Sequence, residues 1–242
     1  MNKLYDEIAG GVTVSDADVE TEYADLVKTQ QESFDASADD YEFAQMNGEL
    51  IVYNPAGYRA IRQIIIAFED AELTEALELT DAIAALNPDS QKEEIEALET
   101  QLSELYATAE ATAQTALEKL NAGADFGEVM DEYDPDSIFQ DEELRKTGYS
   151  ICANSLLWPQ NVIEAAMALE KPGDISEPLR VENGIVILQY AGDVAEGVRP
   201  LDDVREAIRG ELLESRQFGA YRDQIEVWMK EADPKYYPER MQ

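Results

Sequence analysis

Histidine is absent from this chain of 242 residues, and cysteine occurs once, as Cys152. These absences exclude disulfide frameworks within the chain, zinc sites built from cysteine and histidine, and catalytic triads that use an imidazole. Cys152 lies between Ile151 and Ala153 and has no imidazole to activate it. We therefore expect a small buried residue there rather than a nucleophile.

Basic residues are scarce as well, since 18 lysines and arginines stand against 53 acidic residues, for a formal net charge of −35. A field of this sign repels phosphate backbones, so the sequence argues against nucleic acid as a partner. The charge would keep a protein soluble while it holds aggregation-prone clients, but it would equally suit a generally acidic proteome, and both interpretations stay open. The acidic clusters lack the glycine spacing of EF-hand loops, and we expect neither a metal nor another cofactor.

Long hydrophobic runs are also missing. No stretch approaches the roughly 18 apolar residues of a transmembrane helix, and the N-terminus lacks a signal-peptide pattern, so we expect no membrane insertion of this chain. The abrupt start at Met1 ahead of a helical pattern leads us to expect that a leader has been removed. Hydrophobic residues still make up 45% of the chain, enough for a folded core.

Helical patterns occupy the two ends of the sequence. Ser15 with Asp18 predicts a capped helix start, and the pattern ends before the acidic stretch 35–40, ahead of a loop. A long helix opens at Pro200. Its apolar residues, which lie on one side and need a partner surface, are Val204, Ile208, Leu212, Phe218, Tyr221, Ile225 and Trp228.

The middle of the chain predicts a helical hairpin and a small sheet. Residues 69–120 are rich in alanine, glutamate and leucine and break once near Pro88, where Ser90 and Glu93 suggest a capping box. Tyr58–Phe68 is rich in β-branched residues and predicts a buried strand. Arg180–Tyr190 predicts a β-hairpin around its Asn-Gly pair.

Several segments, in this order, resemble the parvulin family of peptidyl-prolyl isomerases, especially the PrsA-like and SurA-like secretion foldases of bacteria. They are Ala60–Ile66, Ala122–Met130 with Tyr133–Asp136, Gly148–Tyr149, Val162–Leu169 with Lys171–Leu179, and Asn183–Leu188. The resemblance implies an α+β fold, with an antiparallel four-stranded sheet, surrounding helices and the hairpin 69–120 as an insertion. It divides the chain into a parvulin-like domain at 58–193 and an all-helical chaperone-like module formed by 1–57 and 194–242.

The same resemblance implies a set of site residues. Gln63 and Val186 stand where active parvulins carry histidines, and Asp136 stands at the loop position of a cysteine or aspartate in the family. Asp136 and Gln63 are thus the catalytic candidates. Together with Val186, the side chains expected to form the prolyl pocket and its edge are Trp158, Val162, Leu157, Tyr149 and Asn183.

Each of these positions also has a simpler structural explanation. Gln63 and Val186 would suit ordinary strand positions, and Trp158 and Val162 would suit a core. Asp136 falls in an Asp-Pro-Asp-Ser segment that is a good turn and helix-cap sequence.

The resemblance implies a foldase or chaperone outside the cytoplasm, secreted or in the cell envelope, with a lipid anchor conceivable in the full-length protein. It would bind unfolded or exported polypeptide at Xaa-Pro bonds, with weak catalysis because both family histidines are replaced. A homodimer stays open. The alternatives are a holdase without catalysis and a structural envelope protein that uses the same fold to bind peptides.

Overall fold

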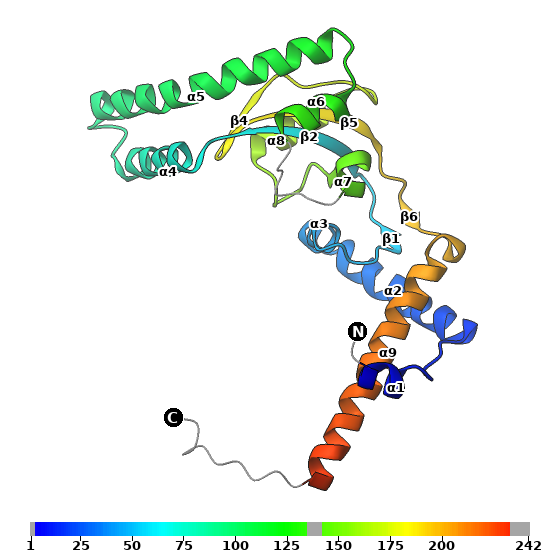
Figure 1. Cartoon of the computed structure of the whole chain (residues 1–242). Coiled ribbons are helices and arrows are strands. Elements are labelled where there is room, and N and C mark those ends of the chain that lie inside the picture. The colour runs from blue at the N-terminus through cyan, green and yellow to red at the C-terminus, as the bar shows by residue number, and fades with distance from the viewer. Residues whose placement is uncertain (1–2, 135–141, 233–242) are drawn as a thin grey trace, which may run out of the picture. The chain divides into compact units, whose positions relative to one another are not determined.

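The computed structural model describes residues 3–134 and 142–232 and divides into two units, which are described separately (Figure 1). The helical unit comprises Met1–Ser33, Leu50–Asn54 and Gly197–Gln242, and the sheet unit comprises Phe34–Glu49 and Pro55–Glu196. The chain therefore passes between the units four times. The division expected at residue 57 differs from this one, because the segment that follows the N-terminal helix packs within the sheet unit.

The sheet unit is built on four antiparallel strands in the order β3-β2-β5-β4, which confirms the predicted fold class. The strands are β2 (Arg59–Ala67), β3 (Tyr149–Ile151), β4 (Leu179–Val181) and β5 (Gly184–Asp193). The two long central strands pair directly, with Ile64 opposite Ile187. Both are buried on their two faces, which explains their nearly continuous β-branched sequence.

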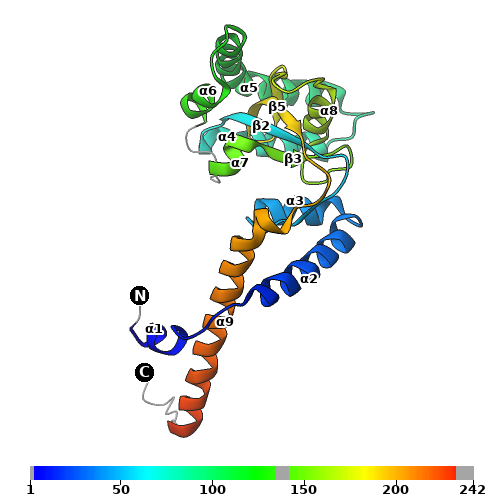
Figure 2. The same cartoon turned by 90° about the vertical axis from the view of Figure 1, so that its right-hand side faces the viewer.

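Side chains of β2 and β5 alternate between two covered faces of the sheet. On one face Ile64 and Ile187 join a core cluster with α5 (Lys92–Asn121) and α6 (Phe126–Tyr133). On the other face Ile61 and Leu188 join a cluster with α8 (Gln160–Ala168). Figure 2 shows α6 and α8 on opposite sides of these strands.

A hairpin joins β4 and β5 as predicted, but its two-residue loop lies one residue before the predicted Asn-Gly pair. Val181 pairs with Gly184, which leaves Glu182 and Asn183 as the two-residue loop. Gly184 has φ +144°, and a Cβ there would lie 2.1 Å from the carbonyl oxygen of Ile66. Glycine is therefore required by the close approach of β2.

The helical hairpin is present as α4 (Asp70–Ala85) and α5. The C-terminal half of α5 packs on the sheet through buried residues such as Tyr106 and Leu117, and α4 packs against α5. The capping box predicted at Ser90 and Glu93 is wrong, because α5 begins only at Lys92 after Gln91. A capping box is found instead at the start of α4, between Glu69 and Glu72.

The helical unit contains α1 (Lys3–Ala9), most of α2 (Asp16–Phe34), α9 (Leu201–Ala232) and the two-stranded pair β1 (Tyr53–Asn54) and β6 (Gly197–Val198). The predicted contact between the N- and C-terminal helices is present, and its buried residues are Val19, Val52, Val204 and Ile208. Within the two described ranges, every helix is too short or too polar to cross a lipid bilayer.

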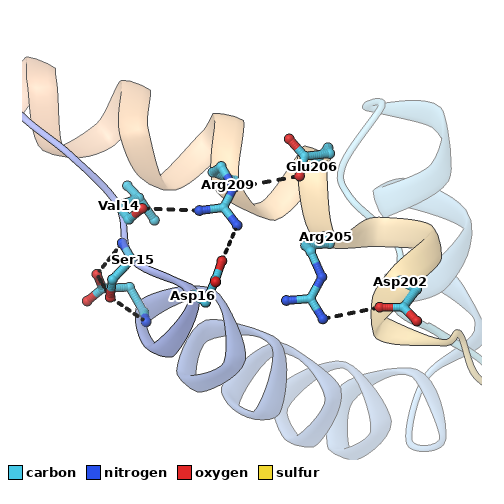
Figure 3. Close-up of polar contacts among 8 residues, drawn as sticks. Val14, Ser15, Asp16, Asp202, Arg205, Glu206 and Arg209 are labelled. Atoms are coloured by element: carbon cyan, nitrogen blue, oxygen red, sulfur yellow. Dashed lines mark hydrogen bonds and ion pairs between the residues drawn. The ribbon is translucent and has the colours of Figure 1, made fainter.

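Polar contacts tie the start of α2 to α9. Ser15 and Asp18 exchange hydrogen bonds through their backbone amides, which confirms the predicted cap. Arg209 binds Asp16 at 2.6 Å and donates to the Val14 carbonyl at 3.1 Å (Figure 3). Hydrogen bonds from Arg216 and Ser15 hold the pKa of Asp18 well below its usual range. Exposed pairs of this kind contribute little each, so they supplement a small core.

Candidate functional site

A pocket of about 170 Å³ opens on the α8 side of the sheet, entirely within the sheet unit. Apolar side chains dominate its wall, with two amides and no ionisable group among the residues that line it. The lining residues are Met46, Gln63, Ile65, Leu157, Trp158, Pro159, Val162, Val181, Asn183 and Val186.

The floor of the pocket follows from strand alternation. Gln63 and Ile65 lie two residues apart on β2, so both point to the α8 face, and Val186 stands opposite Ile65 on β5. Asn183, from the β4–β5 turn, closes one end. Each of these positions is fixed by the pairing of the two central strands.

The walls come from the loop before α8 and from the start of that helix. Trp158 is held by a hydrogen bond from its Nε1 to the Ser150 carbonyl at 3.3 Å. Its ring packs edge-on against Tyr149, with 6.4 Å between the ring centroids. Val162 is 2% exposed and packs beneath it. A bulky apolar wall of this kind suits a compact apolar ring.

Gln63 lies on the floor of the pocket, and its side-chain nitrogen makes no hydrogen bond to the described residues. The residue is 6% exposed. A buried polar atom left without a partner costs about 1–3 kcal/mol, so each such atom calls for an explanation. Gln63 lines the pocket, and its unsatisfied nitrogen lies beneath the pocket surface.

The expected site residues fall into three groups. Six line the pocket together: Gln63, Leu157, Trp158, Val162, Asn183 and Val186. Tyr149 does not line it and lies behind Trp158, where it is 4% exposed. Asp136 lies outside the described residues.

A neighbouring acid was missed by sequence reasoning. The Asp134 side chain is buried and accepts a hydrogen bond from the backbone amide of Ile65 at 3.2 Å. Arg145 donates to the Asp134 carbonyl at 3.1 Å. The carboxylate thus anchors the chain after α6 to the strand that forms the pocket floor. The Asp-Pro-Asp sequence marked this region but did not show that Asp134 is buried.

The second omission is helix α3 (Ala38–Met46), which begins inside the acidic stretch 35–40 that was expected to break the helical pattern. It contributes Met46 to the pocket and contacts β3. Gln45 accepts a hydrogen bond from the Ser150 amide at 2.7 Å. Glu42 is 2% exposed and accepts a hydrogen bond from Ser155, and burial raises the pKa of its carboxyl group.

Cys152 is buried, as predicted. Its backbone amide donates to the Ser155 hydroxyl at 2.8 Å, which links it to the same polar cluster. Within residues 3–134 and 142–232, no group of three carboxylate or cysteine side chains is placed to hold a metal ion.

Residues 89–206 match the family model described as the PPIC-type PPIase domain. The match begins in the turn between α4 and α5 and ends in the first turns of α9, so β2 with Gln63 lies outside it. Two curated relatives are foldase protein PrsA of Clostridium botulinum strain 657, 29% identical over 58% of this chain, and that of Caldanaerobacter subterraneus, 25% identical over 71%. The chain spans 41% and 53% of the length of these two relatives.

Solved structures with similarity include PrsA from Bacillus anthracis, at 18% identity and a TM-score of 0.32 over 97% of this chain and 96% of that one. PrsA from Bacillus subtilis is 16% identical with a TM-score of 0.36, over 99% of this chain and 82% of that one.

Proposed function

We propose that this chain, which carries a parvulin-type (PPIC-type) peptidyl-prolyl isomerase domain, binds unfolded polypeptide at Xaa-Pro bonds and acts as a foldase outside the cytoplasm. The observation that carries the proposal is the apolar pocket with one unsatisfied amide donor at its floor. The prolyl ring lies against Trp158 and Val162, and Gln63 faces the amide to be rotated.

Rotation about the Xaa-Pro bond makes or breaks no covalent bond. Its barrier of about 18–20 kcal/mol comes from the amide resonance that is lost when the bond twists. In the twisted amide the nitrogen lone pair is no longer shared with the carbonyl and can accept a hydrogen bond. A donor at Gln63 Nε2 therefore binds the twisted amide better than the planar one, which lowers the barrier.

The expected catalysis is weak. Gln63 supplies a neutral donor, and Val186 has no hydrogen-bonding group where the family resemblance places a histidine. Each tenfold gain in rate needs about 1.4 kcal/mol of extra binding in the transition state, which is close to the net value of one neutral hydrogen bond. We therefore expect an acceleration of about tenfold from this contact.

The experiment is NMR exchange spectroscopy on a series of Xaa-Pro peptides with the full chain. We expect cis/trans exchange faster than the uncatalysed rate, and a loss of that gain in Gln63→Leu, which preserves size and removes the donor. The matched control is Gln101→Leu on the exposed surface of α5. Exchange at the uncatalysed rate at high protein concentration would exclude catalysis and leave peptide binding to be tested separately.

A holdase without catalysis is the second candidate, favoured by apolar side chains on α9. Phe218, Trp228 and Met229 are 60%, 40% and 58% exposed. Such side chains could hold apolar client segments. We expect this protein to suppress aggregation of an unfolded model client, and failure at equimolar or higher ratio would reject the holdase.

Light scattering by the protein alone tests its oligomeric state, which is a homodimer in one expectation and a larger assembly in the case of a structural envelope protein.

Location outside the cytoplasm is proposed from the PrsA relatives. Fractionation of the source cells, with an antibody to this chain, would test it. Recovery of the protein in the cytoplasmic fraction alone would contradict the proposal.

A further inference from the structure

Two side chains cover the outer edge of strand β3. This strand stands at one end of the sheet order, where Ser150 pairs with Ala60 of β2. The Ser150 amide donates to Gln45 Oε1 at 2.7 Å, and the Ser150 carbonyl accepts from Trp158 Nε1 at 3.3 Å. One residue of β3 therefore binds both Gln45 of α3 and the pocket residue Trp158 through its backbone.

A second pair of contacts ties Gln45 to the same residue. Its Nε2 donates to Ser150 Oγ at 3.0 Å, and the Tyr41 hydroxyl lies 3.4 Å from that oxygen. Ser150 and Tyr41 are 3% and 2% exposed, so water has little access to these bonds. Both ends of the Gln45 amide thus bind one buried residue, which fixes the orientation of the side chain.

Helix α3 also holds the segment between β3 and α8 at a second point. Glu42 accepts hydrogen bonds from the Ser155 hydroxyl and from the backbone amide of Leu157. Glu42 and Gln45 are three residues apart and therefore lie on the same face of the helix. The segment that is held at these two points carries Leu157 and Trp158 into the wall of the prolyl pocket.

The residue after Gln45 belongs to the same wall. Met46 lines the pocket and is 45% exposed, so its position depends on how α3 is docked on β3. Gln45 is the neighbour of Met46 whose side chain makes that docking contact. Helix α3 lies outside residues 89–206, so the family match does not include this part of the wall.

We infer that Gln45 is a positioning residue of the prolyl pocket. It holds Met46 through the docking of α3, and it holds Trp158 through Ser150. The wall that it fixes packs against the prolyl ring, whereas Gln63 on β2 faces the amide that rotates. The inference rests on the proposed binding at Xaa-Pro bonds. It predicts that loss of Gln45 weakens peptide binding and leaves the exchange rate within the bound complex unchanged.

The first measurement needs no peptide. In the Trp228→Phe background Trp158 is the one tryptophan of the chain, so a single indole N–H signal in NMR spectra reports its bond to Ser150. Gln45→Met keeps the length of the side chain and removes its hydrogen bonds. We expect the indole signal to move upfield and acrylamide quenching of the Trp158 fluorescence to increase, because the ring is no longer held. Gln101→Met on the exposed surface of α5 is the matched control and should change neither signal.

The second measurement is peptide binding. Calorimetric titration with a proline peptide should show an affinity about three- to tenfold weaker in Gln45→Met. NMR exchange at saturating peptide should give the parent rate. Gln45→Glu should restore most of the affinity, because its carboxylate accepts from the Ser150 amide as the Gln45 oxygen does. A purely structural role would lower the urea midpoint of Gln45→Met and leave both the Trp158 signals and the affinity of the folded protein unchanged.

A second variant serves if Gln45→Met does not fold. Ser150→Ala removes the hydroxyl that Gln45 Nε2 and Tyr41 contact, and it should shift the Trp158 signals in the same direction by a smaller amount. Unchanged Trp158 signals in the folded variants, or an unchanged affinity, would overturn the inference. If the parent protein binds no proline peptide, the proposed function fails, while the Trp158 signals still decide whether Gln45 positions the ring.

Discussion

The sheet unit and the helical unit are stabilised in different ways. The sheet unit buries apolar clusters on both faces of its sheet, with Ile64 and Ile187 fully enclosed. The apolar cluster between α2 and α9 of the helical unit has four buried side chains among the described residues, and α9 contributes two of them, Val204 and Ile208. Charged contacts between α2 and α9 supplement this core.

This difference bears on what each unit can tolerate. A sheet that is packed on both faces can tolerate an unsatisfied amide and an open pocket on one of them. The helical unit has less apolar burial, so pH and salt should affect it more. Each unit also holds one of the two tryptophans, Trp158 or Trp228, so single-tryptophan variants can follow the units separately.

The largest effect is expected from Ile187→Ala in the sheet core. Removing a fully buried isoleucine side chain costs about 2–5 kcal/mol of unfolding free energy. Urea unfolding followed by Trp158 fluorescence in the Trp228→Phe background measures this loss. Leu77→Ala on α4, where the side chain is 37% exposed, is the matched control. A loss below about 1 kcal/mol would contradict the assignment of stability to this core.

Gln63→Leu should separate catalysis from stability. We expect the rate gain in Xaa-Pro exchange to be lost and the affinity for a planar proline peptide to change little, because the donor binds the twisted amide. The unfolding free energy should stay the same or rise, since the buried amide has an unsatisfied nitrogen. NMR exchange, calorimetric titration and urea unfolding give these three quantities. A large loss of stability would show that Gln63 is a structural residue.

Glu42→Gln tests the pH dependence of the sheet unit. Burial raises the folded-state pKa of Glu42, so its ionisation destabilises the fold progressively as pH rises above the ordinary value of 4.5. The glutamine variant avoids this ionisation and should be more stable than the parent at pH 8, by about 1 kcal/mol. The advantage should disappear near pH 4. An equal difference at both pH values would contradict this explanation.

The smallest effect concerns the helical unit, and its pH dependence is opposite to that of Glu42. The pKa of Asp18 is lowered by its hydrogen bonds from Arg216 and Ser15, so its contribution is present at neutral pH and is lost as pH falls below the ordinary value of 3.8. Asp18→Asn should lower the urea midpoint of Trp228 fluorescence at pH 7, and the difference should vanish at low pH. A difference that persists in acid would show that the carboxylate is not the cause.

Sequence patterns predicted the central strands well because these strands are buried on both faces and rich in β-branched residues. They also predicted the helical hairpin and the Ser15 cap. They missed α3, since its first residues are acidic and its apolar residues Phe43 and Met46 remain half exposed. Its buried residues Tyr41, Glu42 and Ala44 include an acid, so the helical periodicity of apolar residues is weak.

The candidate site was predicted in part. Gln63, Val186 and Asn183 were assigned because two segments of strand and turn resemble the parvulin family. Met46 and Asp134 come from segments whose position depends on tertiary contacts, with α3 docking on the loop before α8 and Asp134 bonding to Ile65. Local sequence does not specify such contacts.

The interleaved division of the chain has a consequence for the order of folding. The sheet unit needs no residue beyond Glu196, whereas the core of the helical unit joins Val19 to Val204 and Ile208. Closing so long a loop is entropically costly, and it cannot happen before the final helix has been synthesised. A chain that emerges from its N-terminus therefore completes its sheet unit first and assembles its helical unit last.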